Sequence, residues 1–246
     1  MVTGGGRGIG RAIAESLAQA GCRLALCSRS DSAVAAAAEL AAGGHECVGG
    51  RADVSRPEEL KAFSEDVLAR YGRIDILVSN AAVNYSGSVL DMAPERFDEI
   101  FATNVRGAFY GVQAVAPAMI ERGGGRIVMI GSFVARSPVR LFAAYSASKA
   151  ALVSLTRGLA LELAEHDVTV NAVCPGNVWS DIWESSTVEL QRLTGKSARQ
   201  FFEDTVATHP LGREQTGADI GAATVWLCSD AARNVTGEAL FVTGGL

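Results

Sequence analysis

The sequence predicts an α/β fold: a single doubly wound domain over residues 1–246, with a seven-stranded parallel sheet and helices on both faces. Short apolar runs rich in β-branched residues alternate with helical patterns of ten or more residues, which is typical of crossover units in a parallel sheet. The length of 246 residues and a hydrophobic content of 48% suit one compact domain with a large core. The sequence shows no repeat of 20–50 residues.

The expected strands are short, and the chain begins almost inside the first of them. Their ranges are 2–3, 23–28, 46–49, 74–79, 126–131, 168–174 and 239–243. A central strand of two residues loses ladder hydrogen bonds and apolar burial, so we expect the native chain to start upstream of Met1.

Six helices are expected between the strands, over residues 8–20, 31–42, 57–71, 94–122, 143–166 and 216–228. The third has an orthodox start, with Ser55 as N-cap, Pro57 at the first helical position and Glu58 behind it. One long insertion, about 179–209, separates the sixth strand from the last helix. We expect it to be a substrate lid, while a helical excursion that only packs on the core is the alternative.

Composition excludes several classes of partner. A net charge of −5 without a basic block offers little to nucleic acid or to anionic membranes. No apolar run reaches the roughly 18–20 residues that cross a bilayer, and the start has no signal-peptide pattern, so we expect a cytoplasmic protein. The five cysteines are scattered and never form CxxC, which predicts neither disulfides nor a metal site.

Two patterns indicate chemistry. The segment TGGGRGIG, residues 3–10, follows an apolar start and opens a helix, with glycines in the order G-x-x-x-G-x-G at Gly4, Gly8 and Gly10. Residues without Cβ let the backbone approach a pyrophosphate at the positive end of a helix. On a later helix, Tyr145 and Lys149 are four residues apart and share one edge. Without further context, such a spacing more often reflects an apolar helix with one tyrosine and one surface lysine than a catalytic pair.

Together, these and further motifs resemble the short-chain dehydrogenase/reductase family, in the group of about 250 residues, over nearly the whole chain. TGGGRGIG resembles the family's TGxxxGxG loop, DV at 53–54 its adenine contact, and SNAA at 79–82 its NNAG stretch, with Ala82 in place of the usual glycine. Asn104, Ser132, YSASK at 145–149 and CPG at 174–176 follow in family order. The resemblance implies a Rossmann-type fold.

The resemblance also implies residue roles. Tyr145 would be the general acid/base, Lys149 would tune it and hold the nicotinamide ribose, Ser132 would donate a hydrogen bond to the substrate oxygen, and Asn104 would hold a water. A free phenol has a pKa near 10, and a cation within about 4–6 Å favours its ionised form. As alternatives, Ser132 is only a turn residue at the end of a strand, and Asn104 is an amide inside a helix that forms hydrogen bonds with backbone groups.

NADP is the expected cofactor, and NAD the less favoured one. Ser28 stands where NAD-specific members carry an acid, Arg29 follows it and could grip a 2′-phosphate, and Arg7 offers a second cation. The resemblance places Gly176, Val178 and Ser180 at the nicotinamide carboxamide. The full set of expected cofactor-binding residues is Gly4, Gly6, Arg7, Gly8, Ile9, Gly10, Ser28, Arg29, Asp53, Val54, Asn80, Tyr145, Lys149, Gly176, Val178 and Ser180.

By the same resemblance, the expected function is NADP-dependent hydride transfer between nicotinamide and the carbonyl or alcohol carbon of a small or medium-sized organic substrate. One alternative is a 3-oxoacyl-carrier-protein reductase, which needs a basic surface that Arg136, Arg140 and Arg157 neither establish nor exclude. Another is a dinucleotide-binding regulator without catalysis. The helices that start at 94 and 143 are apolar on more than one side, which in this family often means subunit contacts, so the resemblance implies a homo-oligomer, and we expect a tetramer.

The lining of the substrate pocket is open at this point. In the insertion, Trp179, Trp183, Phe201 and Phe202 form either an apolar wall over the substrate or part of the core. The resemblance implies a pocket lining for Phe133, Val134 and Phe142, which lie between Ser132 and Tyr145.

Overall fold

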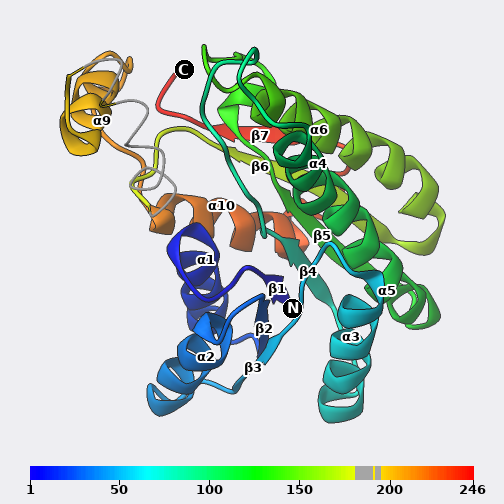
Figure 1. The fold of residues 1–246 in the computed structure, drawn as a ribbon. Coiled ribbons are helices and arrows are strands. Elements are labelled where there is room, and N and C mark those ends of the chain that lie inside the picture. The colour runs from blue at the N-terminus through cyan, green and yellow to red at the C-terminus, as the bar shows by residue number, and fades with distance from the viewer. Residues whose placement is uncertain (181–190, 192–194) are drawn as a thin grey trace.

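The computed structural model describes residues 1–180, 191 and 195–246, and within these ranges seven strands form one parallel sheet (Figure 1). Their order across the sheet is β3-β2-β1-β4-β5-β6-β7, so the chain winds outward in both directions from β1 and confirms the doubly wound fold. The bounds are β1 Val2–Thr3, β2 Leu24–Ser28, β3 Cys47–Arg51, β4 Ile76–Ser79, β5 Gly125–Ile130, β6 Val168–Pro175 and β7 Ala239–Val242.

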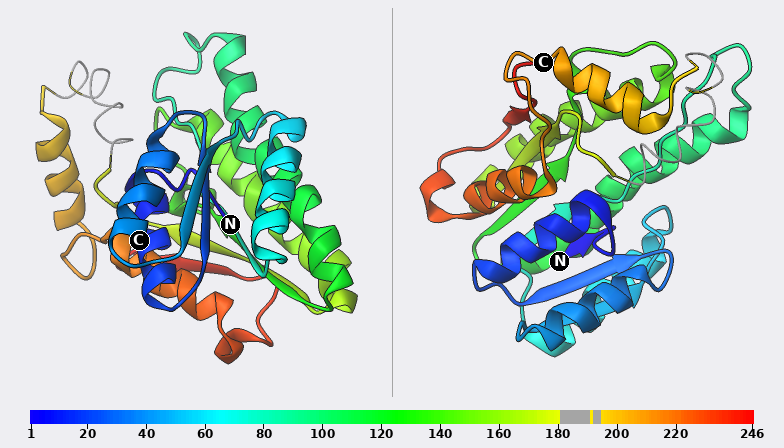
Figure 2. Two further views of the ribbon diagram at one scale, coloured as in Figure 1. Left: turned by 90° about the horizontal axis from the view of Figure 1, so that it is seen from below. Right: turned by 90° about the vertical axis from the view of Figure 1, so that its left-hand side faces the viewer.

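Helices cover both faces of this sheet (Figure 2). Each face has its own apolar core. Helices α1 (Gly8–Gln19), α2 (Ser32–Ala42) and α10 (Gly217–Cys228) pack on one face with Leu26 and Val173. The opposite face carries α3 (Pro57–Tyr71), α5 (Gly107–Glu121) and α6 (Ala143–Leu163), packed on Leu77 and Ile127. Helix α9 (Ala198–Ala207) lies outside both layers. Because β6 is covered on both faces, all eight of its residues are buried.

The long helix expected over 94–122 is interrupted. The structure divides it into α4 (Pro94–Phe101), a π-helical segment (Ala102–Arg106) and α5. Such segments are frequent at functional sites, because one extra residue per turn redirects the side chains. Asn104 lies in the middle of the π segment and bonds the backbone of Val83, a contact between distant segments that hydrophobic periodicity does not reveal.

The central strand is short, but Met1 extends its ladder. Val2 pairs with Leu26 on one side and with Val78 on the other. The Met1 carbonyl accepts a hydrogen bond of 2.9 Å from the Val78 N–H, and its amino group donates one of 2.8 Å to the Ile76 carbonyl. Burial lowers the pKa of this amino group.

No helix in the described ranges combines the length and the apolar character needed to cross a membrane.

Candidate active site

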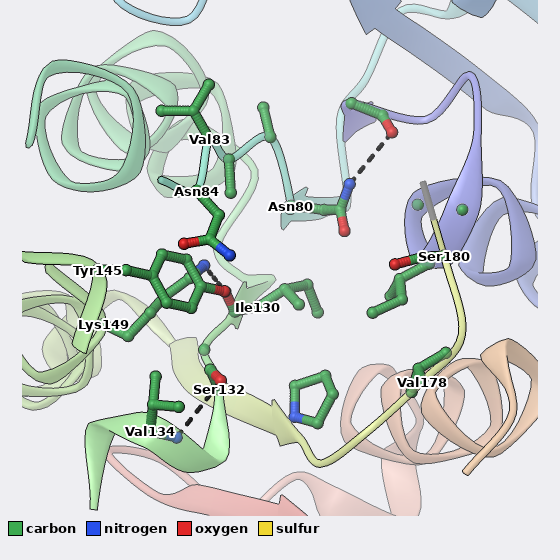
Figure 3. Close-up of a pocket in the computed structure, with 18 of the residues that line it drawn as sticks. Asn80, Val83, Asn84, Ile130, Ser132, Val134, Tyr145, Lys149, Val178 and Ser180 are labelled. Carbon is green, nitrogen blue, oxygen red and sulfur yellow. Dashed lines mark hydrogen bonds between the residues drawn. The ribbon is translucent and has the colours of Figure 1, made fainter. Parts of the chain in front are cut away.

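A cavity of about 930 Å³ opens at the carboxyl ends of the strands, the edge at which doubly wound sheets bind ligands (Figure 3). The glycine loop, the ends of β2, β4, β5 and β6, helix α6 and helix α9 all contribute to it. Most of the expected site residues line it, namely Gly4, Arg7, Gly8, Ile9, Gly10, Ser28, Arg29, Val54, Asn80, Ser132, Tyr145, Lys149, Gly176, Val178 and Ser180.

Three expected site residues lie outside this lining. Gly6 packs on the start of α2, where a Cβ would come within 2.5 Å of the Ser32 side chain. The Asp53 carboxylate accepts hydrogen bonds of 2.9 and 2.8 Å from the N–H and hydroxyl of Ser55. Asn104 is buried behind Val83, whose N–H and C=O it bonds at 2.8 and 3.0 Å, and it donates to Ser148 at 3.0 Å. Its side chain therefore bonds backbone, which fits the alternative interpretation, while the expected water-holding role of Asn104 stays a prediction.

The glycine loop is shaped for close approach of a ligand. Gly4 and Gly8 have φ of +63° and +53°, a left-handed conformation that residues with a Cβ rarely adopt. Gly10 packs so tightly that a Cβ there would overlap the Gly4 carbonyl and the Asn80 amide. That amide donates hydrogen bonds of 3.1 Å to the carbonyls of Thr3 and Gly4, which fixes the loop to β4. Helix α1 thus directs its N-terminus at the cavity, an arrangement that favours anions.

Cations and hydroxyls surround the cavity at the end of β2. Ser28 contacts Ser32 with their hydroxyl oxygens 3.0 Å apart, and Ser30 and Arg29 complete this lining. Within the described residues, no Asp or Glu lines the cavity. The nearby acid Asp31 instead forms a bidentate pair with Arg51. Ser30 and Ser32 also line the cavity, but the sequence analysis did not predict this, because it considered only Ser28 and Arg29 at the end of this strand.

Arg29 has a partner that the sequence did not indicate. Its guanidinium lies 3.5 Å from a carboxylate oxygen of Glu99 on α4. The other oxygen of Glu99 accepts a 2.7 Å hydrogen bond from the Tyr85 hydroxyl and lies 3.2 Å from Arg96. These contacts lower the pKa of Glu99, the Tyr85 bond being the largest cause. Seventy residues separate Arg29 from Glu99, so only the tertiary structure reveals the pair.

Ser132, Tyr145 and Lys149 meet at the other end of the cavity (Figure 3). Ser132 follows β5 and caps a short 3-10 helix, accepting a 3.4 Å hydrogen bond from Val134 N–H, so it is a turn residue as well as a lining residue. Tyr145 and Lys149 share one edge of the first turns of α6, as expected. The Lys149 side chain is buried, its Nζ is 5.7 Å from the centre of the Tyr145 ring, and it donates a 2.7 Å hydrogen bond to Ile130 O.

The electrostatics of this pair differ from the expectation. Burial raises the pKa of Tyr145 to about 12, against the opposing effect of a hydrogen bond with Ser132. Burial lowers the pKa of Lys149 to about 8. Burial is thus the largest cause of the Tyr145 pKa in this structure, and a lowering of that pKa by Lys149 together with an oxidised nicotinamide stays a prediction. A phenol that stays protonated near pH 7 is suited to donating a proton.

The aromatic residues divide between the cavity and the core. Phe133, Val134 and Phe142 line the cavity as expected, and so does Phe201 of α9. Phe202 is instead fully buried and packs edge-on against Trp179, with ring centres 5.2 Å apart. The expected wall of four aromatics is thus only partly confirmed, and Trp183 lies outside the described residues. Lining residues that the sequence interpretation missed include Asn84, Leu141 and Thr205.

Known proteins resemble this chain over its whole length. Residues 4–246 match the family model described as enoyl-(acyl carrier protein) reductase. The 3-oxoacyl-[acyl-carrier-protein] reductase FabG of Staphylococcus aureus is 33% identical, over 100% of this chain and 96% of that protein. A tryptophan variant of actinorhodin polyketide ketoreductase, solved with NADPH, has a TM-score of 0.95 at 36% identity, with 100% and 96% covered. L-Sorbose reductase from Gluconobacter frateurii, solved with NADPH and L-sorbose, has a TM-score of 0.92 at 31% identity, with 99% and 94% covered.

Proposed function

The chain belongs to the short-chain dehydrogenase/reductase family, and from this we infer that it is an NADP-dependent oxidoreductase acting on carbonyl or alcohol carbons. It transfers hydride between nicotinamide and a small or medium-sized organic substrate. The observation that carries this function is the meeting of Ser132, Tyr145 and Lys149 in the cavity that also contains the glycine loop and Arg29.

The residues that line the cavity suit NADP. Gly4, Gly8 and the N-terminus of α1 suit a pyrophosphate. A side chain at position 10 would overlap the glycine loop, so Gly10 keeps the loop in place. Arg7 and Arg29 supply cations for a 2′-phosphate, and no acid among the described lining residues would repel it. Bound NADPH would supply the hydride.

The protein's own contribution to reduction is the proton. We propose that Ser132 donates a hydrogen bond to the substrate carbonyl, which orients it toward Tyr145. The Tyr145 O–H bond breaks as its proton passes to the carbonyl oxygen, while the carbonyl carbon accepts hydride and becomes an alcohol carbon. The Lys149 ammonium stabilises the resulting phenolate, which regains a proton from solvent. Asn104 supports this end of the site through Val83 and Ser148.

The test is NADPH oxidation by the purified protein with a broad panel of ketones and aldehydes. We expect turnover that Tyr145→Phe abolishes while NADPH binding, followed by nicotinamide fluorescence, stays within twofold of wild type. Turnover that survives in the phenylalanine variant would reject Tyr145 as the acid. Wild-type protein that binds NADPH but reduces nothing would support the regulator alternative.

A 3-oxoacyl-carrier-protein reductase remains the second candidate, because the FabG relatives carry that name. Of the arginines weighed for a carrier surface, Arg140 lines the cavity, whereas Arg136 stacks at 4.1 Å over the Phe241 ring. If this candidate is right, an acyl carrier protein loaded with a 3-oxoacyl group should compete with small ketones in turnover. Absence of competition at saturating carrier would exclude it.

We also propose a single domain over residues 1–246, a homotetramer, a cytoplasmic location, and a lid role for the segment at about 179–209. Exposed apolar side chains on α5 and α6 support self-association, Leu161 being 83% exposed. Phe201 and Thr205 of α9 line the cavity, which supports a lid role for this segment. The cysteines are free thiols, as is usual in a reducing compartment. Sedimentation that shows only a 25.6 kDa species would refute the tetramer.

A further inference from the structure

His209 is a buried imidazole that the proposed mechanism does not use. It lies just beyond the end of α9 and is only 3% exposed. Its Nε2 atom is 2.9 Å from the amide nitrogen of Asn177, a cavity-lining residue that is also 3% exposed. Burial lowers the pKa of His209, against an opposing effect of the Arg213 backbone, so the ring is neutral near pH 7. The Asn177 amide therefore donates this hydrogen bond and Nε2 accepts it.

Asn177 belongs to a segment that follows β6 and runs along the cavity from its catalytic end to the glycine loop. At one end, β6 pairs with β5, the strand that leads to Ser132. At the other end, a Cβ on Gly8 would lie 3.8 Å from the Cβ of Ser180. Figure 3 shows Ser180 across the cavity from Tyr145. A dinucleotide with its pyrophosphate at the glycine loop and its nicotinamide at Tyr145 therefore extends along this segment.

The loop that contains His209 is fixed to the sheet by backbone contacts of its own. The Leu211 N–H donates a 3.1 Å hydrogen bond to the carbonyl of Gly244, which follows β7. Within the loop, the Gly212 N–H donates a 2.8 Å hydrogen bond to the His209 carbonyl. The imidazole is thus a fixed partner for Asn177, and removal of the ring leaves these backbone bonds of the loop intact.

The segment around Asn177 lies beyond the regular ladder between β6 and β7. That ladder ends at Gly176, whose N–H donates a 2.9 Å hydrogen bond to the last residue of β7. From there, the His209 bond and a bridge between Val178 and Gln215 join the segment to the loop. Because Asn177 is buried, loss of the imidazole leaves its amide unpaired and favours a shift of the segment. A shift of about 1 Å beside reacting groups costs roughly 100-fold in rate.

We propose that His209 is a positioning residue for hydride transfer: through Asn177, it holds the segment after β6 in the place where the nicotinamide end of the cofactor lies. His209 does not line the cavity, so it acts through Asn177 and not on the reacting atoms. This inference rests on the proposed oxidoreductase function and adds the residue that fixes the wall beside the nicotinamide.

Two ligands test this by separating the two ends of the cavity, because 2′,5′-ADP carries the adenosine and the 2′-phosphate of NADPH but no nicotinamide. In His209→Ala we expect a several-fold higher Kd for NADPH and an unchanged Kd for 2′,5′-ADP. The kcat for ketones should fall roughly 10- to 100-fold with little change in their KM. The primary isotope effect with NADPH deuterated at the transferred position should increase, because hydride transfer becomes slower.

Matched variants separate positioning from folding. His209→Gln places an amide acceptor where Nε2 lies, so it should restore kcat and NADPH affinity toward the wild-type values. Asn177→Ala should reproduce the losses of His209→Ala, and the double variant should lose no more than either single variant, because all three lack the same bond. Thr208→Ala is the control: the Thr208 hydroxyl donates a 2.7 Å hydrogen bond to the Thr205 carbonyl, and its loss should change none of these quantities.

Several results would overturn the proposal: wild-type kcat and NADPH affinity in folded His209→Ala, additive losses in the double variant, or no recovery in His209→Gln. A lower Tm with wild-type kcat would identify the contact as purely structural and would overturn it as well. Where His209→Ala does not fold, Asn177→Ala compared with His209→Gln gives the same decision. A wild-type protein that reduces no carbonyl would count against the proposed function, while the comparison of NADPH with 2′,5′-ADP would still decide the role of His209.

Discussion

Lys149 Nζ donates a 2.7 Å hydrogen bond to the carbonyl oxygen of Ile130, the last residue of β5, and the lysine is only 3% exposed. This bond holds the ammonium at the end of β5, 5.7 Å from the centre of the Tyr145 ring. Burial removes this ammonium from water, and that loss lowers the pKa of Lys149 to about 8. The consequences can be measured in both stability and activity.

Stability should depend on pH through Lys149. A lysine in the unfolded chain titrates near 10.5 and Lys149 near 8, so between these values the unfolded state binds a proton that the folded state does not. The free energy of unfolding should therefore rise from pH 8 to 10.5, by about 3 kcal/mol at most from this group, and lose that gain as pH falls. Urea unfolding at several pH values checks this. In Lys149→Met the free energy of unfolding should rise less steeply with pH over this range. An equal dependence on pH in both proteins would contradict the prediction.

Ketone reduction should fall as pH rises through about 8. Below that pH Lys149 carries its charge and Tyr145, with a pKa near 12, keeps its proton, which is the state required for proton donation. Above it, the phenolate that forms in the reaction loses its nearby cation. The measurement is the pH profile of kcat at saturating NADPH and ketone. A profile that stays flat up to pH 10 would assign no catalytic role to the Lys149 charge.

Cofactor preference should depend on Arg29 and on its partner Glu99. Arg29→Ala should weaken NADPH binding roughly 10- to 100-fold relative to NADH, because a charge-assisted bond to the 2′-phosphate is lost. Glu99→Gln should tighten NADPH binding only a few-fold, since the carboxylate is a third exposed and partly screened. Calorimetric Kd values for both cofactors test this, with the exposed Arg157→Ala as control. Equal losses for NADPH and NADH in Arg29→Ala would argue against a phosphate contact.

Two helical glycines offer a matched comparison. In Gly10→Ala the new methyl group would overlap the Gly4 carbonyl and the Asn80 amide, so we expect lower stability and at least tenfold weaker NADPH binding. Gly158, on the exposed side of α6, has nothing within 4 Å of an added Cβ. Gly158→Ala should therefore raise stability by about 0.5–1 kcal/mol without affecting the cofactor. Thermal unfolding and NADPH titration measure the stability and the cofactor affinity of both variants. If the two variants changed these quantities alike, the packing argument would be refuted.

Docking of α9 should depend on Phe202. Its ring is fully buried against Trp179, and the same helix brings Phe201 and Thr205 to the cavity. Phe202→Ala removes a contact of the kind that costs about 3–5 kcal/mol in a core, so α9 should detach locally and raise the KM for ketones several-fold. Faster proteolysis within α9 would accompany this. Leu211→Ala, at a 60% exposed position, is the control and should change neither. Unaltered proteolysis and KM in Phe202→Ala would show that α9 does not depend on this ring.

The sequence by itself determined the sheet and the order of its elements, because these follow from local patterns, and its resemblance to a known family indicated most of the cavity lining. Apolar runs specify buried parallel strands, glycine spacing specifies the loop, and four-residue spacing puts Tyr145 and Lys149 on one helical edge.

Only the tertiary structure decided the rest, because it depends on contacts between distant segments. Burial, which no local pattern measures, raised the pKa of Tyr145 where its neighbouring cation alone predicted a lower one. The π segment at Asn104, the Arg29–Glu99 pair and the bond between Asn177 and His209 likewise arise where chain segments meet in space.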